Sequence, residues 1–154
     1  MSAERVYEMG HAELRGLWEE TRVCEMEHAE LRGLWQETRI PLRYRKRVLA
    51  GLCRAFNVPR IRVRSCKVPG AHGCYYVRDG EPRIDLCPRS GSDMLTLAHE
   101  FAHYVTHMRC PRARDHGPTF LFHYMQVCDA LRLVPAAGFR AACRKHGLRI
   151  ARVK

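Results

Sequence analysis

The sequence of 154 residues lacks any run of eighteen apolar residues, so we expect no membrane-spanning helix. Its first residues lead directly into charged side chains and lack the apolar core of a secretory signal peptide. We therefore expect a protein of the cytosol, the nucleoid or the nucleus, neither secreted nor partnered with a membrane. A chain of this length predicts one domain with an appendage.

Cysteine pairs of the Cys-x-x-Cys type are absent, although the chain has eight cysteines. Several of these lie on apolar faces of predicted elements, where a free cysteine behaves as a small hydrophobic residue. We expect reduced, mostly buried thiols. A second, all-cysteine zinc site is the less favoured alternative, because the spacings do not match those of known sites.

Acidic residues are scarce beyond the first quarter of the chain. Residues 1–40 contain five Arg and nine Glu, whereas residues 41–154 contain 22 basic and seven acidic residues, giving net charges of −4 and +15. A surface this basic favours a polyanionic partner, with nucleic acid first, although a solvated face without a dedicated partner also explains it. No base-reading motif is present, so we expect binding through phosphates that weakens with salt.

One apolar stretch, residues 96–105, contains the pattern His-Glu-x-x-His. On a helix, His99 and His103 lie on one face with their Cβ atoms about 5–6 Å apart, and imidazoles at that spacing can share a zinc ion. Glu100 can reach a zinc-bound water without being a ligand, which is the arrangement of a zinc peptidase. Core histidines are the alternative, but buried His and Glu side chains need partners, and zinc provides them.

Catalytic zinc usually has three protein ligands, so a third is expected downstream. The candidates are His107, Asp115, His116, His123 and Asp129. His107 continues the same helix face, but positions i and i+8 lie about 12 Å apart, too far for one metal. His116 is better placed, because Gly117-Pro118 follows it and proline favours the first turn of a helix. The predicted site is therefore His99, His103 and His116 as ligands of Zn²⁺, with Glu100 as catalytic residue.

Taken together, these motifs resemble a known family. His99-Glu100-x-x-His103, a short loop, and then His116-Gly117-Pro118-Thr119-Phe120 are similar to the paired motifs of the SprT-like (Spartan-type) zinc metalloproteases. The segment 83–88 also resembles the strand before the active helix in that family, and the resemblance covers about residues 45–130. It implies a small metalloprotease of the minigluzincin type, a family whose better-known members act on proteins bound or crosslinked to DNA.

An internal repeat occupies most of the acidic region. Residues 5–21 and 22–38 are identical at 14 of 17 aligned positions. A step of 17 residues rotates a helix by about −100°, so one straight helix would not align the apolar stripes of both copies. Either the copies form two helices, or one copy docks while the other projects. We expect the repeat to lie against the basic core or to bind a partner through Trp18 and Trp35.

The remaining pattern predicts an α+β fold. Helices are expected over 43–56, 118–133 and 136–146, an active helix after a Ser90–Asp93 capping box, and strands over 60–64, 74–78 and 83–87. We expect a zincin-like domain over 41–154, with a short three-stranded, mostly antiparallel sheet packed on the active helix, preceded by the helical repeat over 1–40. Residues 148–154 are either an edge strand or a basic tail.

Two features of the strands bear on binding. Strand 74–78 or 83–87 is expected to line the cleft beside the active helix and to hold a substrate peptide as an added strand. Arg60, Arg62 and Arg64 share one face of their strand, which makes them candidate phosphate contacts.

Three functions are consistent with this sequence. The first is a zinc-dependent endopeptidase that hydrolyses peptide bonds with a zinc-activated water and Glu100 as general base, acting on DNA-associated proteins. The second is a zinc peptidase with a regulatory target independent of DNA. The third is a non-enzymatic, zinc-stabilised nucleic-acid-binding module. A peptidase also needs an oxyanion donor, for which the candidates are Tyr75, Tyr76, His123 and Tyr124.

Overall fold

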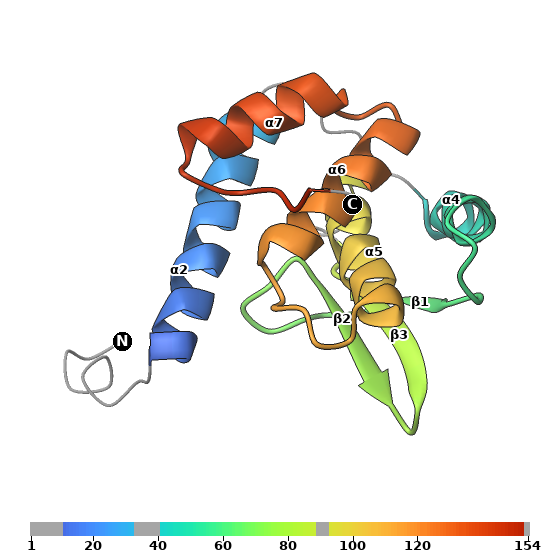
Figure 1. The fold of residues 1–154 in the computed structure, drawn as a ribbon. Helices are drawn as coiled ribbons and strands as arrows, with labels where there is room; N and C mark the ends of the chain where they lie inside the picture. Colours follow the sequence, from blue (N-terminus) through green and yellow to red (C-terminus); the bar gives the residue numbers. More distant parts are fainter. Residues whose placement is uncertain (1–10, 33–40, 89–92, 153–154) are drawn as a thin grey trace.

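The computed structural model describes residues 11–32, 41–88 and 93–152 (Figure 1). Within these residues the protein is α+β. Its elements are α2 (His11–Met26), η1 (Glu27–Leu31), α4 (Leu42–Ala55), β1 (Arg62–Ser65), β2 (Gly73–Arg78), β3 (Glu81–Leu86), α5 (Met94–Arg109), α6 (Pro118–Ala130) and α7 (Ala136–Lys145). Helices α5 and α6 pack side by side in the middle, with α2 on one flank and α4 on the other (Figure 1). None of the helices in these ranges is long and apolar enough to span a bilayer.

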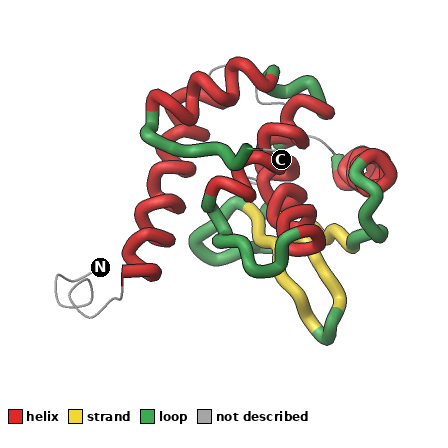
Figure 2. The backbone as a smooth tube through the Cα atoms, in the orientation of Figure 1, coloured by secondary structure: helices red, strands yellow, loops and turns green. Residues whose placement is uncertain are grey.

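The three strands form a mixed sheet in the order β1-β3-β2, drawn in yellow in Figure 2. Strands β2 and β3 form an antiparallel hairpin closed by Asp79 and Gly80, whose φ angles of 54° and 74° suit a tight two-residue turn. Strand β1 pairs with β3 in parallel. The expectation of a mostly antiparallel sheet was therefore wrong, because the connection over residues 66–72 is long enough to bring β1 to the far edge of β3.

Helix α5 runs over residues 94–109 and packs against β2, β3 and α6. It begins at Asp93, whose carboxylate accepts hydrogen bonds from the Thr96 backbone N–H at 2.8 Å and from the Thr96 hydroxyl at 3.0 Å. The expected capping box used Ser90 as the cap, but the cap is Asp93, and Ser90 lies outside the described residues. The helix is buried around most of its circumference, as its apolar sequence predicted.

The C-terminal elements lie close to their expected ranges. Helix α6 ends at Ala130 rather than near Leu133, because Arg132 turns to a φ of 54° and the Leu133 N–H bonds to the Cys128 carbonyl at 2.9 Å. Residues 148–152 form no strand. They reach the start of α6, where the Ala151 N–H donates to the Pro118 carbonyl at 3.0 Å.

The described part of the repeat forms one continuous helical segment over residues 11–32. It crosses the junction between the two copies at Thr21 and Arg22 without a break, so separate helices do not begin there. The π-helical turn η1 adds one residue to the turn, and the buried residues Met26 and Leu31 are consequently five positions apart. The second copy can therefore keep one face against the core.

That face joins the main core. Val23, Met26 and Leu31 are fully buried in one cluster with residues of α5 and α6. Ion pairs surround this contact: Glu19 with Arg114 at 2.6 Å, Glu30 with Lys145 at 2.7 Å, and Arg32 with Asp93 at 3.6 Å. The acidic repeat thus lies against the basic core, while Trp18 is 46% exposed and Trp35 lies outside the described residues.

All eight cysteines are free thiols. Four of them, Cys53, Cys87, Cys128 and Cys143, are buried. No group of cysteines in the described chain is arranged to bind a metal ion.

Candidate metal centre

Helix α5 places two imidazoles and one carboxylate at the floor of a cleft. His99 and His103, one helical turn apart, bring their Nε2 atoms to 3.1 Å from each other. The third imidazole is that of His116, whose Nε2 lies 3.2 Å from that of His103 and 3.3 Å from that of His99. Among the described residues this is the one group of side chains suited to hold a metal ion.

His116 reaches the other two because the chain turns sharply just after it. Gly117 is the N-cap of α6, and Pro118 occupies the first helical position. Phe120, one turn into α6, packs beneath the ligands. Its ring stacks on His103 at 4.3 Å between centroids and lies 5.1 Å from His116 and 5.2 Å from His99. The aromatic residue of the motif therefore lies against all three imidazoles and stacks on one of them.

The three nitrogen atoms fit a tetrahedral zinc ion. Ligands about 2.0–2.1 Å from a tetrahedral zinc are about 3.3 Å apart, close to the 3.1–3.3 Å between these atoms. Three Nε2 atoms so close together cannot all satisfy one another by hydrogen bonds, since each offers one lone pair or one proton. A cation at their centre satisfies all three, and imidazole nitrogen is a ligand of zinc as it is of copper, iron and nickel.

The charge states of two of these histidines agree with a role as ligands. Burial, together with the neighbouring histidines, lowers the pKa of His103 well below its usual value. The same causes lower the pKa of His116 to about 4. Both imidazoles are therefore neutral near pH 7, which is the form that donates a lone pair to a metal.

His99 differs because a carboxylate adjoins it. Its Nδ1 forms a short hydrogen bond with Glu27, in the π turn of the repeat. Burial lowers the pKa of His99, but the charge and hydrogen bond of Glu27 raise it more, to about 9. For Glu27, burial raises the pKa, but His99, Tyr124 and Arg32 together lower it, so the carboxylate stays ionised. Glu27 was not predicted as part of the site, because it is one of nine glutamates in the first 40 residues.

Glu100 lies beside the histidine cluster without belonging to it. Its side chain is buried, and Oε2 accepts a hydrogen bond of 2.7 Å from the backbone N–H of Tyr75 in β2. Burial raises the pKa of Glu100, and this effect exceeds the opposing effects of His99 and of the Tyr75 N–H. A carboxylate whose pKa is raised toward neutrality is suited to accept a proton and to release it again.

Gly73 allows strand β2 to approach Glu100 this closely. A Cβ atom at this position would lie 3.0 Å from Glu100 Cγ, 3.0 Å from Leu86 Cδ2 and 3.1 Å from Thr96 Cγ2. The expected strand began at residue 74, one residue after Gly73, and no local pattern distinguished this glycine from the others. Its role depends on the packing of a strand against a helix that follows it in the sequence.

The cleft above the histidines has a volume of about 750 Å³. The repeat lines it with Glu20, Cys24 and His28, and the segment from Gly70 to Tyr75 also lines it. Strand β2 is an edge strand of the sheet and lines the cleft, whereas β3 is central and paired on both sides. Of the two strands considered for holding a peptide, only β2 has a free edge.

The other candidates for the third metal ligand do not join the histidine cluster. His107 and His123 do not reach the histidine cluster: His107 Nδ1 contacts the Tyr75 hydroxyl at 2.5 Å, and His123 Nδ1 contacts the Thr106 hydroxyl at 2.9 Å. Asp115 lines the cleft next to His116 but is not part of the cluster, and neither is Asp129.

Among the four candidate oxyanion donors, Tyr75 is the one that lines the cleft. Tyr76 donates instead to Asp85 at 3.1 Å, on the sheet. His123 and Tyr124 are buried behind the ligands in α6.

The chain and its fold were compared with known protein families, curated proteins and solved structures, and none of the three comparisons gave a match.

Proposed function

We propose that this protein is a zinc-dependent peptidase. The observation that supports this best is the triangle of Nε2 atoms from His99, His103 and His116, with the Glu100 carboxylate beside it in an open cleft. The resemblance of the two motifs to SprT-like zinc metalloproteases supports the same conclusion. The proposal includes a zincin-like arrangement of sheet edge, active helix and second helix.

The three imidazoles would hold the zinc ion through Nε2. When bound, zinc polarises a carbonyl group and lowers the pKa of water. Glu100 accepts the proton of the attacking water and then delivers it to the leaving amine. Because Oε2 accepts the Tyr75 N–H at 2.7 Å, Oε1 is the oxygen left for this transfer. The hydrogen bond to Tyr75 also restricts rotation of the carboxylate.

The substrate would bind along strand β2. An extended peptide can add to a free sheet edge through main-chain hydrogen bonds. The outward N–H of Tyr75 already bonds to Glu100, so this point of the edge lies next to the catalytic carboxylate. A peptide along β2 would therefore pass its backbone beside Glu100 and the three histidines.

The test is the variant Glu100→Gln, which keeps the shape of the side chain and removes the base. It should bind zinc as the wild type does and lose peptide hydrolysis by about 10²–10⁴-fold. Cleavage of an unstructured protein such as casein measures the activity, and zinc content is measured on the same samples. Equal cleavage by wild type and variant would remove Glu100 from this role.

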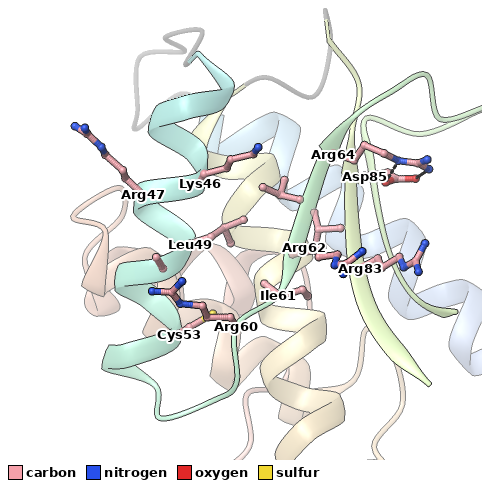
Figure 3. Close-up of a pocket in the computed structure, with 13 residues that line it drawn as sticks. Lys46, Arg47, Leu49, Cys53, Arg60, Ile61, Arg62, Arg64, Arg83 and Asp85 are labelled. Atoms are coloured by element: carbon pink, nitrogen blue, oxygen red, sulfur yellow. Dashed lines mark hydrogen bonds and ion pairs between the residues drawn. The ribbon is translucent and has the colours of Figure 1, made fainter. Parts of the chain in front are cut away.

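A second surface supports a nucleic-acid partner. A groove of about 570 Å³ lies between α4 and β1, lined by six cationic side chains: Lys46, Arg47, Arg60, Arg62, Arg64 and Arg83 (Figure 3). The acidic residue of the lining, Asp85, is neutralised by Arg64 through contacts of 2.8 and 3.1 Å. Within the described chain, Lys46, Arg60 and Arg62 have no ion pair with an acid, and all three are exposed. We propose that this groove, at the β1 edge of the sheet and opposite the β2 edge that lines the cleft, binds the phosphates of DNA.

Fluorescence anisotropy with a labelled duplex between 50 and 200 mM salt tests this proposal. In the wild type, log K should fall steeply as log salt rises. Replacing Lys46, Arg60 and Arg62 together with glutamine should make this fall less steep by up to about 2.7, at about 0.9 per phosphate contact. The matched control is the triple variant of Arg140, Arg144 and Arg149, which removes the same charge elsewhere. Arg140, Arg144 and Arg149 line a separate basic pocket, so equal weakening in both variants would show that the groove between α4 and β1 is not the specific DNA site.

The same proteins separate the two peptidase hypotheses. If the targets are DNA-associated proteins, DNA should stimulate cleavage in the wild type and not in the groove variant. Cleavage that does not respond to DNA would favour a target independent of DNA. Tight DNA binding with no cleavage would favour the non-enzymatic module.

A further inference from the structure

We propose that Glu27, from the second copy of the N-terminal repeat, is a positioning residue of the metal centre. Its carboxylate accepts the Nδ1–H of His99 and thereby directs the Nε2 lone pair of that ring toward the metal. The inference rests on the metal site of the proposed function, but it concerns zinc binding rather than peptide hydrolysis.

Geometry makes this contact specific. The side chains of His99 and Glu27 are 14% and 13% exposed, so the pair is shielded from most of the solvent. An ionised carboxylate can only accept a hydrogen bond, so the proton of the neutral His99 ring must lie on Nδ1. The opposite nitrogen, Nε2, then carries the lone pair and lies at the centre of the cluster, 3.1 Å and 3.3 Å from its two counterparts.

A carboxylate in this position strengthens the ligand in two ways. It fixes the tautomer and the orientation of the ring, and it raises the basicity of the nitrogen that binds the metal. Neither His103 nor His116 has an acidic partner of this kind among the ion pairs of the described residues. Among the ion pairs of the described residues, Glu27 is therefore the carboxylate that contacts a ring of the cluster directly.

The differences between the repeat copies point to the same residue. The copies differ at three aligned positions: Tyr7 and Cys24, Gly10 and Glu27, Glu19 and Gln36. At the second of these positions, the first copy has glycine where the second has the His99 partner. If the first copy docked in place of the second, a glycine would stand where Glu27 does and no carboxylate would face His99. Docking through the second copy is therefore what gives His99 its partner.

Glu19, another of these three differences, supports the third ligand indirectly. Its Oε1 accepts from Arg114 at 2.6 Å, two residues before His116. The buried face of the repeat thus bonds to His99 through Glu27 and to the His116 loop through Glu19. The repeat is accordingly part of the metal centre rather than a separate appendage.

Zinc affinity of the full chain, measured by competition with a chromophoric chelator, tests the proposal. Glu27→Ala should weaken zinc binding by about 10- to 100-fold. Glu27→Gln should weaken it less, because the amide oxygen still accepts the Nδ1–H but carries no charge. The matched control is Glu30→Gln in the same π turn, which loses contacts to Lys145 and His146 but does not touch His99.

Nitrogen-15 NMR of the His99 ring reports the tautomer directly, and Glu30→Gln, which weakens the helix contact but keeps Glu27, should leave that tautomer unchanged. In the neutral His99 ring of zinc-free wild-type protein, the proton should reside on Nδ1, whereas in Glu27→Ala the two tautomers should exchange. Wild-type zinc affinity in Glu27→Ala, or an equal loss in Glu30→Gln, would overturn the proposal. A wild type that binds zinc but cleaves no peptide would refute the proposed function and leave this inference standing. Absence of zinc binding would overturn both.

Discussion

Replacing Gly73 with alanine should misplace the catalytic carboxylate without touching a zinc ligand. The added Cβ would lie 3.0–3.1 Å from carbon atoms of Glu100, Leu86 and Thr96. Carbon atoms in favourable contact are about 3.5–4.0 Å apart, so β2 must move away from α5 by about 0.5–1 Å. The three contacts come from both the strand β3 and the helix α5, so no single side-chain rotation relieves them.

The size of the effect follows from this displacement. Overpacking of this kind costs about 1–3 kcal/mol of stability, which for a domain of this size corresponds to about 2–12 °C in Tm. A misplacement of 1 Å at a catalytic group can reduce activity about 100-fold. We therefore expect kcat/KM to fall by about 10- to 100-fold, with zinc still bound, because the contact between the Tyr75 N–H and Glu100 is disturbed while the histidines are not.

The assay compares kcat/KM, Tm and zinc content of Gly73→Ala with those of Gly51→Ala. A Cβ at Gly51, within helix α4, has no neighbour within 4 Å, so this control should keep full activity and gain up to about 1 kcal/mol. Wild-type kcat/KM and Tm in Gly73→Ala would refute the reasoning, because they would mean that β2 does not approach Glu100 as described.

Three further predictions concern the ligands and the fold. Phe120→Ala should destabilise the protein by about 3–5 kcal/mol, because it empties the space beneath three imidazoles, and calorimetry should also detect weaker zinc binding. Zinc should raise the Tm of chelator-treated wild type but not that of His116→Ala, since the third ligand is missing. The hydrogen bond and charge of Arg64 lower the pKa of Asp85 in the folded protein. The ionised carboxylate therefore stabilises the fold above the pKa that it has in the unfolded chain, and this contribution is lost as pH falls through the lower pKa of the folded state. Wild type should therefore exceed Asp85→Asn in Tm near neutral pH, and the difference should shrink in acid; a difference independent of pH would contradict this.

Local sequence patterns predicted the centre of the site. His99 and His103 are one turn apart on a helix whose apolar sequence already indicated burial. His116 was favoured because a Gly-Pro pair follows it, and the structure brings its Nε2 into the cluster. These predictions depended only on helix geometry and on residues within one short segment.

Contacts between distant segments were not predictable in the same way. Glu27 lies 72 positions before His99 in the sequence, and nothing in its own neighbourhood sets it apart from the other glutamates. The parallel pairing of β1 with β3 depended on the path of the connection, which strand patterns do not specify. The π turn was missed because a helical repeat predicts regular spacing, whereas docking required one extra residue.

X-ray absorption at the zinc edge of the full, zinc-loaded chain identifies the atoms that bind the metal. We expect a first shell of nitrogen and oxygen at about 2.0–2.1 Å, with the outer scattering of imidazole rings, and loss of that pattern in His116→Ala. Sulfur ligands at about 2.3 Å would place the metal on cysteines and rule out the three-histidine centre, as would a chain that retains no zinc.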